Sequence, residues 1–226
     1  MKFTYYGHSC FSVVAGGKSL LFDPFITPNE LASTIDVDKI EADYIFISHG
    51  HYDHIFDAVN IAKRTGAKAL GNYEIFDWLN KQGLTNNHPI NPGGKFDFDF
   101  GTVKAVTAVH SSSFPDGSYA GVAGGYVFKT PDGNFYYSGD TGLTLDMQLI
   151  AKWAQLDFAV LPIGDGLTMG VEDALIAAEY AGANTVIGVH FDTFGYIKID
   201  HQTALDTFAE AGKTLKMLNI GEVIDL

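Results

Sequence analysis

The alternation of apolar and polar positions along the chain predicts a first series of strands at residues 2–6, 11–14 and 19–22. Adjacent glycines at 16 and 17 predict a tight turn between the second and third of these strands. Residues 27–39 are polar and are expected to be irregular, whereas an apolar run at 44–47 predicts a buried strand. Helical spacing of apolar residues then predicts helices at 55–64 and 73–80, on either side of a short strand at 67–70.

The second half of the chain repeats this order of elements. Residues 86–94 are expected to form a turn-rich connector and 102–109 a strand, and the polar segment 114–121 lies near the midpoint. A hairpin is predicted over 122–137, followed by strands at 157–161 and 185–189 and helices at 171–181 and 201–211. Hairpins followed by β-α units, twice over, predict the α/β (α+β) class, with two mixed sheets packed face to face and helices outside.

The length and composition fit one well-buried unit. The chain has 226 residues and is 46% apolar, so we expect a single domain over residues 1–226 with two similar halves, about 1–115 and 116–226. No sequence repeat is strong enough to establish a duplication. Many aromatic side chains fit either a core or an interface between copies, so a homo-oligomer stays open.

Charge and cysteine content exclude several classes of protein. A net charge of −13 argues against nucleic-acid binding and against anionic membranes, which select clustered Lys and Arg. The single cysteine, Cys10, excludes an internal disulfide and is expected to be a buried thiol. The chain begins with a strand pattern and not with a signal peptide, and nothing in it resembles a membrane span. We therefore expect a cytoplasmic protein with no membrane contact.

The most distinctive stretch is Ser48-His49-Gly50-His51-Tyr52-Asp53-His54, which follows the apolar run at 44–47. It carries three imidazoles and one carboxylate within six residues. Neutral imidazole suits Zn, Fe and Ni better than Ca or Mg. Packing alone does not explain so many ligand groups in one place, although a polar loop with chance histidines is the plain alternative. We therefore predict a metal site in a loop between a strand and a helix.

Three further ligand candidates, His110, Asp140 and His190, each follow a predicted strand. The resulting order, H-x-H-x-D-H and then His, Asp and His, resembles the metallo-β-lactamase superfamily. Other segments that fit this resemblance are Gly7-His8-Ser9, Phe22-Asp23-Pro24 and the turns at 138–142 and 188–191. Within that superfamily the chain looks most like the small metal-dependent hydrolases related to the ascorbate-6-phosphate lactonase group. The resemblance implies a four-layer αββα sandwich.

The resemblance also implies a ligand set for two divalent ions, with Zn favoured and Mn or Fe compatible. One ion would be held by His49, His51 and His110, and the other by Asp53, His54 and His190, with Asp140 bridging the two. Asp23 would be a buried carboxylate that orients a ligating histidine, although Asp-Pro is also a common surface turn. His8 would lie near the metals as a substrate contact or general acid, with a structural role as the alternative.

The reaction expected from such a site is hydrolysis. Two ions roughly 3.5–4 Å apart lower the pKa of a bridging water and brace the attacked group. We therefore expect a metal-bridged hydroxide to cleave a small ester, lactone or phosphoester, with an anionic substrate favoured by the residual positive charge. Antibiotic hydrolysis is not expected, because Asp140 stands where many true β-lactamases carry Cys. The alternative is a metal-binding sensor or assembly subunit without turnover.

Four other polar residues have less distinctive surroundings in the sequence. The sequence leaves the roles of Asp165 and Asp192 open, as turn residues, ligand supports or substrate contacts. His88, between Asn and Pro, is expected to lie in an exposed loop, and His201 is expected to open a helix outside the site.

Overall fold

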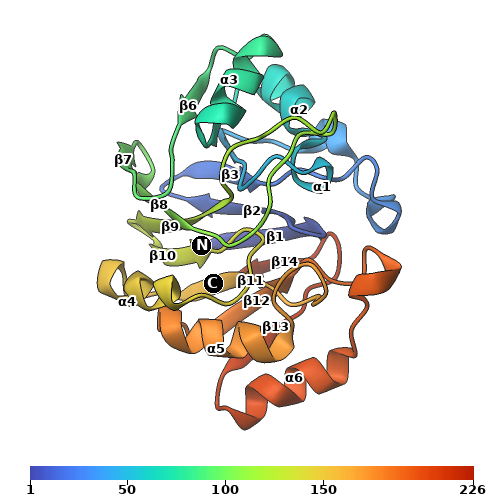
Figure 1. The fold of residues 1–226 in the computed structure, drawn as a ribbon, viewed down its shortest axis with the longest axis vertical. Helices are drawn as coiled ribbons and strands as arrows, with labels where there is room; N and C mark the ends of the chain where they lie inside the picture. The colour runs from blue at the N-terminus through green and yellow to red at the C-terminus, as the bar shows by residue number, and fades with distance from the viewer.

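The computed structural model describes residues 1–226 and contains two seven-stranded mixed sheets that face each other (Figure 1). The first sheet has the order β14-β1-β2-β3-β4-β5-β6. Its strands are β1 (Lys2–Gly7), β2 (Cys10–Ala15), β3 (Lys18–Phe22), β4 (Tyr44–Phe46), β5 (Lys68–Gly71), β6 (Asn87–Pro89) and β14 (Val223–Asp225). The second has the order β13-β12-β11-β10-β9-β8-β7. Its strands are β7 (Lys95–Phe98), β8 (Gly101–Thr107), β9 (Gly124–Thr130), β10 (Gly133–Tyr137), β11 (Phe158–Pro162), β12 (Thr185–Val189) and β13 (Thr214–Lys216).

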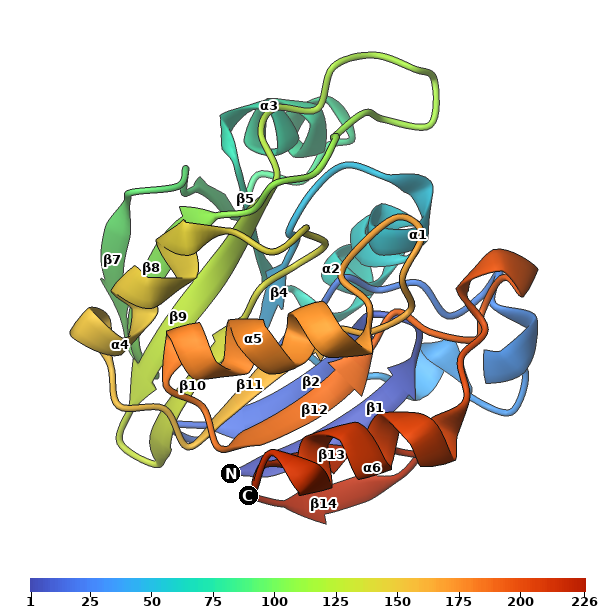
Figure 2. The same ribbon diagram turned by 60° about the horizontal axis from the view of Figure 1, so that its bottom comes forward.

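Helices cover the outer face of each sheet (Figure 2). The first sheet carries α1 (Tyr52–Ile55), α2 (Ala58–Thr65) and α3 (Tyr73–Lys81). The second carries η3 (Leu145–Leu149), α4 (Ile150–Trp153), α5 (Val171–Ala181) and α6 (His201–Glu210). Three short 3-10 helices, η1 (Glu30–Ala32), η2 (Val37–Lys39) and η4 (Gly195–Ile197), lie in the connections. The predicted αββα sandwich is confirmed, whereas the assignment to one domain with two similar halves stays a prediction.

The core between the sheets is built from aromatic rings. Phe22 stacks on Phe11 with ring centroids 4.4 Å apart, and Phe128 stacks on Phe135 at 4.3 Å across the other sheet. Alternation sends Leu20 and Phe22 inward, while Leu21 packs under the helices of the first sheet. Each such ring, fully buried, contributes about 1.5–3 kcal/mol relative to an exposed one. This central layer fixes the two sheets against each other and gives the site a rigid base.

Most predicted elements are present, but short edge strands and one helix break were missed. The helix expected at 55–64 is divided into α1 and α2 at Phe56 and Asp57. Asp57 is buried there, and its carboxylate accepts hydrogen bonds from the backbone N–H groups of Ile26 and Thr27. It therefore stabilises the loop that follows β3. The connector expected at 86–94 contains the strand β6. The sequence also did not predict four short elements elsewhere, which are β7, β13, β14 and α4. Cys10 is buried, as expected.

His88 is not the exposed loop residue that its Asn and Pro neighbours suggested. It lies in β6, is half-buried, and its ring packs edge-on against Phe96 at 4.3 Å. The prediction was wrong because β6 adds to β5 as a parallel edge strand, which local sequence does not reveal.

The connectivity brings five chain segments to one edge of the sandwich. In the first sheet β3 runs parallel to β4, and in the second sheet β10, β11 and β12 run parallel to one another. Within each sheet these strands therefore end at the same edge. β1 points the same way as β3, because β2 lies between them and is antiparallel to both. β8 points the same way as β10 for the same reason, with β9 between them. The loops that carry His8, His49, His110, Asp140 and His190 therefore meet. None of the helices has the length and hydrophobicity needed to cross a bilayer.

Candidate metal centre

The loop after β4 places its histidines in a tight group. His51 is the extended residue before α1, with φ −65° and ψ 149°, so its side chain and that of His49 converge instead of diverging along a helix. His49 Nε2 and His51 Nδ1 lie 2.9 Å apart. His110, from the loop after β8, joins them, and the ligand atoms of all three lie within 4.8 Å of one another.

A second group lies beside the first and is joined to it by Asp140. The ligand atoms of His8, Asp53, His54 and His190 lie within 4.8 Å of one another. Asp140 Oδ2 lies 2.9 Å from His190 Nε2 and 3.3 Å from His54 Nε2, and 3.7 Å from His110 Nε2 in the first group. All seven predicted ligands are thus brought together, with Asp140 between the two groups.

Asp23 lies beneath the cluster as a fully buried carboxylate. Its Oδ2 accepts hydrogen bonds from His54 Nδ1 at 2.8 Å, from Ser48 Oγ at 2.5 Å and from Tyr137 OH at 2.5 Å. The bond to His54 Nδ1 directs the Nε2 atom of that ring toward Asp140. Asp23 is therefore not a surface turn residue, and it orients a candidate ligand in the way that a supporting carboxylate does in metal sites.

Ser48 and Tyr137 were not predicted as part of the site. Ser48 donates to Asp23, and its Oγ lies 3.0 Å from His49 Nδ1, so it also fixes the ring of His49. Tyr137 ends β10 in the second sheet and reaches across the core to Asp23. Serine beside a metal motif and tyrosine at a strand end are common residues, so only the fold reveals these contacts.

His8 is held on both sides of its ring. Nε2 lies 2.9 Å from Asp53 Oδ2, and Nδ1 lies 3.0 Å from the hydroxyl of Thr193. The ring is buried against Phe25 and Phe194, and the carbonyl of His8 accepts the backbone N–H of His190 at 3.0 Å. His8 therefore links candidate ligands from the loop after β4 and from the end of β12. Thr193 gave no signal in the sequence.

Backbone strain concentrates at the same place. The non-glycine residues with left-handed φ are all Asp or His: His8 (54°), Asp23 (39°), Asp165 (61°), His190 (56°) and Asp192 (63°). The left-handed region costs L residues of order 1 kcal/mol or more and recurs at functional sites. Three of the five residues belong to the cluster, so the fold holds these side chains in positions that relaxed backbone would not give.

Burial and neighbouring charges shift the pKa values of the cluster in opposite directions. Burial lowers the pKa of His49 well below its usual value, and it also lowers those of His51 and His110. Burial would do the same to His54, but the carboxylates of Asp140 and Asp23 outweigh it and hold that pKa well above the usual range. The first group thus presents neutral imidazoles, which are the form that binds metal.

The two site carboxylates stay ionised despite their burial. Burial alone would raise the pKa of Asp140, yet the nearby imidazoles of His190 and His54 hold it well below its usual value. The pKa of Asp53 is likewise lowered, because His54 and His8 outweigh burial. Burial lowers the pKa of His8 itself to about 4, with His190 contributing. Anionic oxygens and neutral imidazoles together form a donor set for divalent cations.

Some buried ligand atoms of the cluster have no hydrogen-bond partner in the protein. His54 Nε2 and Asp140 Oδ1 make no hydrogen bond, although buried polar atoms are normally paired. Every ion pair of Asp53 and Asp140 is with a histidine, and no Lys or Arg neutralises either carboxylate. Ligand atoms that converge with no Lys or Arg among them fit divalent metal ions.

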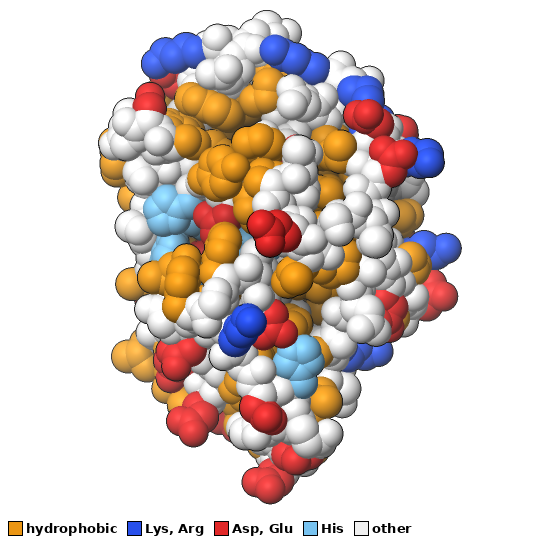
Figure 3. All heavy atoms as spheres, turned by 90° about the vertical axis from the view of Figure 1, so that its right-hand side faces the viewer, with side chains coloured by type: hydrophobic (Ala, Val, Ile, Leu, Met, Phe, Trp, Pro, Cys, Tyr) orange, Lys and Arg blue, Asp and Glu red, His pale blue; other side chains and the backbone are white.

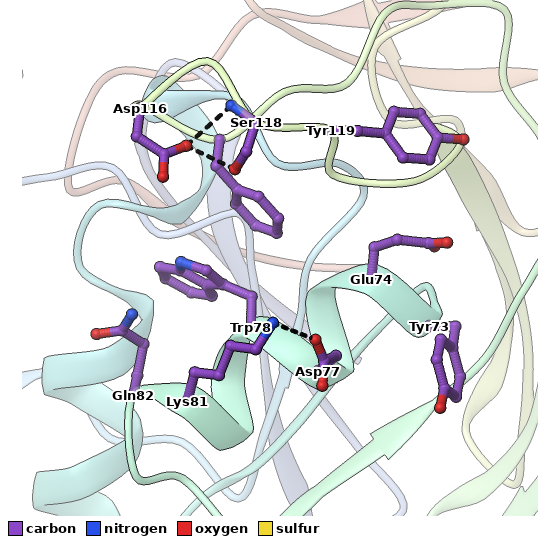
Figure 4. Close-up of a pocket in the computed structure, with 10 residues that line it drawn as sticks. Tyr73, Glu74, Asp77, Trp78, Lys81, Gln82, Asp116, Ser118 and Tyr119 are labelled. Carbon is purple, nitrogen blue, oxygen red and sulfur yellow. Dashed lines mark hydrogen bonds and ion pairs between the residues drawn. The ribbon is translucent and has the colours of Figure 1, made fainter.

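The loop at residues 111–121 packs on the metal loop and is supported by α3. A Cβ on Gly50 would lie 2.3 Å from Ala120 Cβ, so only glycine allows this approach between His49 and His51. Phe114 stacks on Trp78 of α3, with ring centroids 5.2 Å apart. A cavity of about 490 Å³ lies between this loop and α3 (Figure 4), and none of the candidate ligands lines it.

Asp165, Asp192 and His201 lie outside the cluster. Asp165 is an exposed turn residue that accepts the N–H of Gly166. Asp192 pairs with His201 at 2.6 Å and accepts the N–H of Ile199, so it supports the loop after β12. His201 opens α6, as expected.

Comparison with known proteins identifies the family. The model of the beta-lactamase superfamily domain matches residues 18–191, which include all seven candidate ligands. The chain belongs to the beta-lactamase superfamily. A UPF0173 metal-dependent hydrolase of Flavobacterium johnsoniae is 49% identical over 226 residues, and one of Christiangramia forsetii is 50% identical over 227 residues. Both matches cover the whole of each chain.

Two solved structures have a similar fold. Igni18, a metallo hydrolase from the archaeon Ignicoccus hospitalis, superposes with a TM-score of 0.89 and is 33% identical, covering 99% of this chain and 97% of its own. An isothiocyanate hydrolase from Delia radicum gut bacteria has a TM-score of 0.81 at 19% identity, covering 100% and 99%. The second likeness concerns the fold alone.

Proposed function

We propose that the protein is a metal-dependent hydrolase that uses two divalent ions to cleave a small ester, lactone or phosphoester. The observation that carries the proposal is the pair of adjoining ligand groups, with Asp140 between them and with buried ligand atoms that make no hydrogen bond. The names of its relatives agree, since they are called metal-dependent hydrolases. The proposed ligands are His49, His51 and His110 for one ion, Asp53, His54 and His190 for the other, and Asp140 for both.

The donor set favours zinc. Five imidazoles and two carboxylates suit Zn better than Mg or Ca, while Mn and Fe are also compatible. When bound, two such ions would lower the pKa of a water molecule and polarise the bond to be cleaved. A cluster that keeps net positive charge would favour a substrate with an anionic or carbonyl-bearing reacting group.

The chain's own residues would set the geometry of this site. Asp23 keeps the Nδ1 proton of His54 and leaves Nε2 free to act as a ligand. Ser48 does the same for His49 through its hydroxyl oxygen. His8 contacts Asp53 Oδ2, the oxygen that also lies 3.8 Å from His54 Nε2 and 3.8 Å from His190 Nε2. Because both nitrogens of His8 are engaged and the ring is buried, we propose that His8 positions Asp53 and does not itself protonate a leaving group.

The first test is metal content together with turnover. Protein purified without chelator is analysed for metal, then assayed with bis-p-nitrophenyl phosphate and a simple lactone. We expect two ions per chain and activity that Asp140→Ala abolishes. Asp206→Ala, which removes an exposed carboxylate from α6, is the matched control and should behave as wild type. Metal without turnover of either substrate would favour a binding role, and protein that takes up no metal would contradict the proposal.

A further inference from the structure

A row of aromatic side chains borders the metal centre on the His8 side, and we call it the aromatic ledge. Each of its five rings lies next to another ring of the row. Between ring centroids, Tyr52 lies 5.1 Å from Phe56 and 5.6 Å from Phe25. Phe25 lies 6.5 Å from Phe194, which stacks on Tyr196 at 5.6 Å. They come from three separate segments, which are the loop after β3, α1 with the residue that follows it, and the loop after β12. The ledge is therefore a product of the fold and not of one local sequence.

The ledge is continuous with the metal cluster. Phe25 and Phe194 both pack against His8, with ring centroids 5.6 and 5.4 Å away, and His8 contacts Asp53. Tyr52 lies in the chain between His51 and Asp53. Figure 3 shows histidine and acidic side chains that open to the surface among hydrophobic ones. A molecule with its reacting group at the cluster would therefore extend over these rings.

Much of the ledge faces solvent. Tyr196 is 65% exposed, Tyr52 45% and Phe56 41%. Clustered exposed apolar side chains on a soluble domain mark a binding surface. Beside the ledge lies a cavity of about 400 Å³, lined by Phe25, Leu31, Phe194 and Tyr196 among others, which is within the size range of small-molecule sites.

The residues of the ledge and of the adjoining cavity offer no attraction for a second anionic group on the ligand. None of its five residues is charged, and the one charged residue that lines the adjoining cavity is Glu30. Every ion pair at the cluster involves only histidine and aspartate. A substrate with a second phosphate or carboxylate would find no Lys or Arg among the ledge residues or the residues that line this cavity, whereas a flat apolar group would find aromatic faces.

We infer that the aromatic ledge binds an aryl group of the substrate, so that the substrate is an aryl-bearing ester or lactone with one polar reacting group. This inference rests on the proposed function, because the cluster supplies the anchor for the reacting group. Tyr196, Phe56 and Phe194 are the residues that would determine specificity.

The test compares three hydroxamates that present the same metal-directed group and differ only in what it carries. Acetohydroxamate carries a methyl group, 2-phenylacetohydroxamate adds a phenyl ring, and succinic monohydroxamate adds a carboxylate. Dissociation constants are measured by titration calorimetry on protein whose metal content has been determined. We expect the phenyl compound to bind about tenfold tighter than acetohydroxamate, equal to about 1.4 kcal/mol, and the succinic compound to bind no tighter than acetohydroxamate.

Variants then assign the effect to the ledge. Tyr196→Ala and Phe56→Ala should each reduce the phenyl preference to roughly threefold or less and leave acetohydroxamate binding unchanged, because burial of the aryl group is what each ring supplies. Tyr73→Ala is the matched control: it removes a ring that is 59% exposed on α3 and packs on Phe76, outside the ledge. This control should keep the full preference.

Two kinds of failure are distinguishable. Protein that holds no metal, or that binds none of the three compounds, would contradict the proposed function and the inference with it. Metal-loaded protein that binds acetohydroxamate as tightly as the phenyl compound, or that prefers the succinic compound, would overturn the inference about the ledge alone. A preference that survives in both ledge variants would also overturn it.

Discussion

Asp23 shows how one buried residue determines the direction of several others. Its side chain accepts hydrogen bonds from Ser48, His54 and Tyr137, which join both sheets beneath the cluster. A neutral amide at this position would lose the charge that holds the Nδ1 proton of His54. We expect Asp23→Asn to weaken metal binding by roughly 10–100-fold, the range seen when groups that orient metal ligands are changed. Metal titration of the purified variant measures this.

Asp57→Asn is the matched control for Asp23→Asn. Asp57 is an equally buried carboxylate that accepts three hydrogen bonds, but from the backbone and side chain of residues 26–27 and not from a candidate ligand. Loss of hydrogen bonds to a charged group should destabilise each variant by about 1.5–3 kcal/mol. Metal affinity should fall only for Asp23→Asn, and an equal fall in both variants would show that general destabilisation is the cause.

His8 can be tested with a residue that tolerates its backbone. Asparagine adopts the left-handed conformation that His8 holds at φ 54°, so His8→Asn removes the imidazole with little added strain. If His8 positions Asp53, the variant should still hold two ions at saturation and lose about 10–100-fold in turnover. A stoichiometry of one ion per chain would instead make His8 a ligand. The pH profile of kcat should keep its shape, because an acid catalyst is not being removed.

At the level of elements, the approach of the loop 111–121 to the metal loop depends on Gly50. A methyl group there would overlap Ala120 Cβ at 2.3 Å and press on Phe114. We expect Gly50→Ala to displace His49, His51 or the loop that follows His110 and to weaken metal binding by the cost of overpacking, about 1–3 kcal/mol. Isothermal titration with Zn²⁺ would measure the change.

A second substitution should restore the space. Ala120→Gly removes the methyl group that the new side chain would meet, so the double variant Gly50→Ala with Ala120→Gly should recover most of the affinity. Ala120→Gly alone should change metal binding little. A double-mutant cycle with no coupling between the two positions would show that the loop contact does not control the site.

The elements also show what the sequence could predict and what it could not. The long strands and helices were predictable because alternation, as in Leu20 to Phe22, or helical spacing marks the buried face. The ligand candidates were predictable because His and Asp are chemically distinctive and follow strands. Ser48, Tyr137 and Thr193 were not, because their roles depend on partners distant in sequence. The edge strands β6, β7, β13 and β14 are three or four residues long, so pairing and not local pattern defines them.

At the scale of the whole molecule, bound metal should stabilise the fold. Ions that bind only the folded state at a hundred times their dissociation constant add about 2.7 kcal/mol per site. For a chain of 226 residues each site corresponds to a rise in Tm of about 5–10 °C, so two ions should raise Tm by about 10–20 °C. Differential scanning calorimetry of protein treated with chelator and then reloaded with Zn²⁺ measures it. The rise should be much smaller in Asp140→Ala and unchanged in Asp206→Ala, and an equal rise in both would point to nonspecific binding.

The first and last strands of the chain are neighbours. β14 pairs antiparallel with β1, and the backbone of Leu226 exchanges hydrogen bonds with Met1, the amino group to Leu226 O at 2.6 Å and the amide to Met1 O at 2.8 Å. During synthesis on the ribosome, the outer edge of β1 therefore remains without its partner until residues 223–225 have emerged. Until then the nascent polypeptide carries an unpaired strand edge, which neighbouring chains can pair with and which chaperones protect.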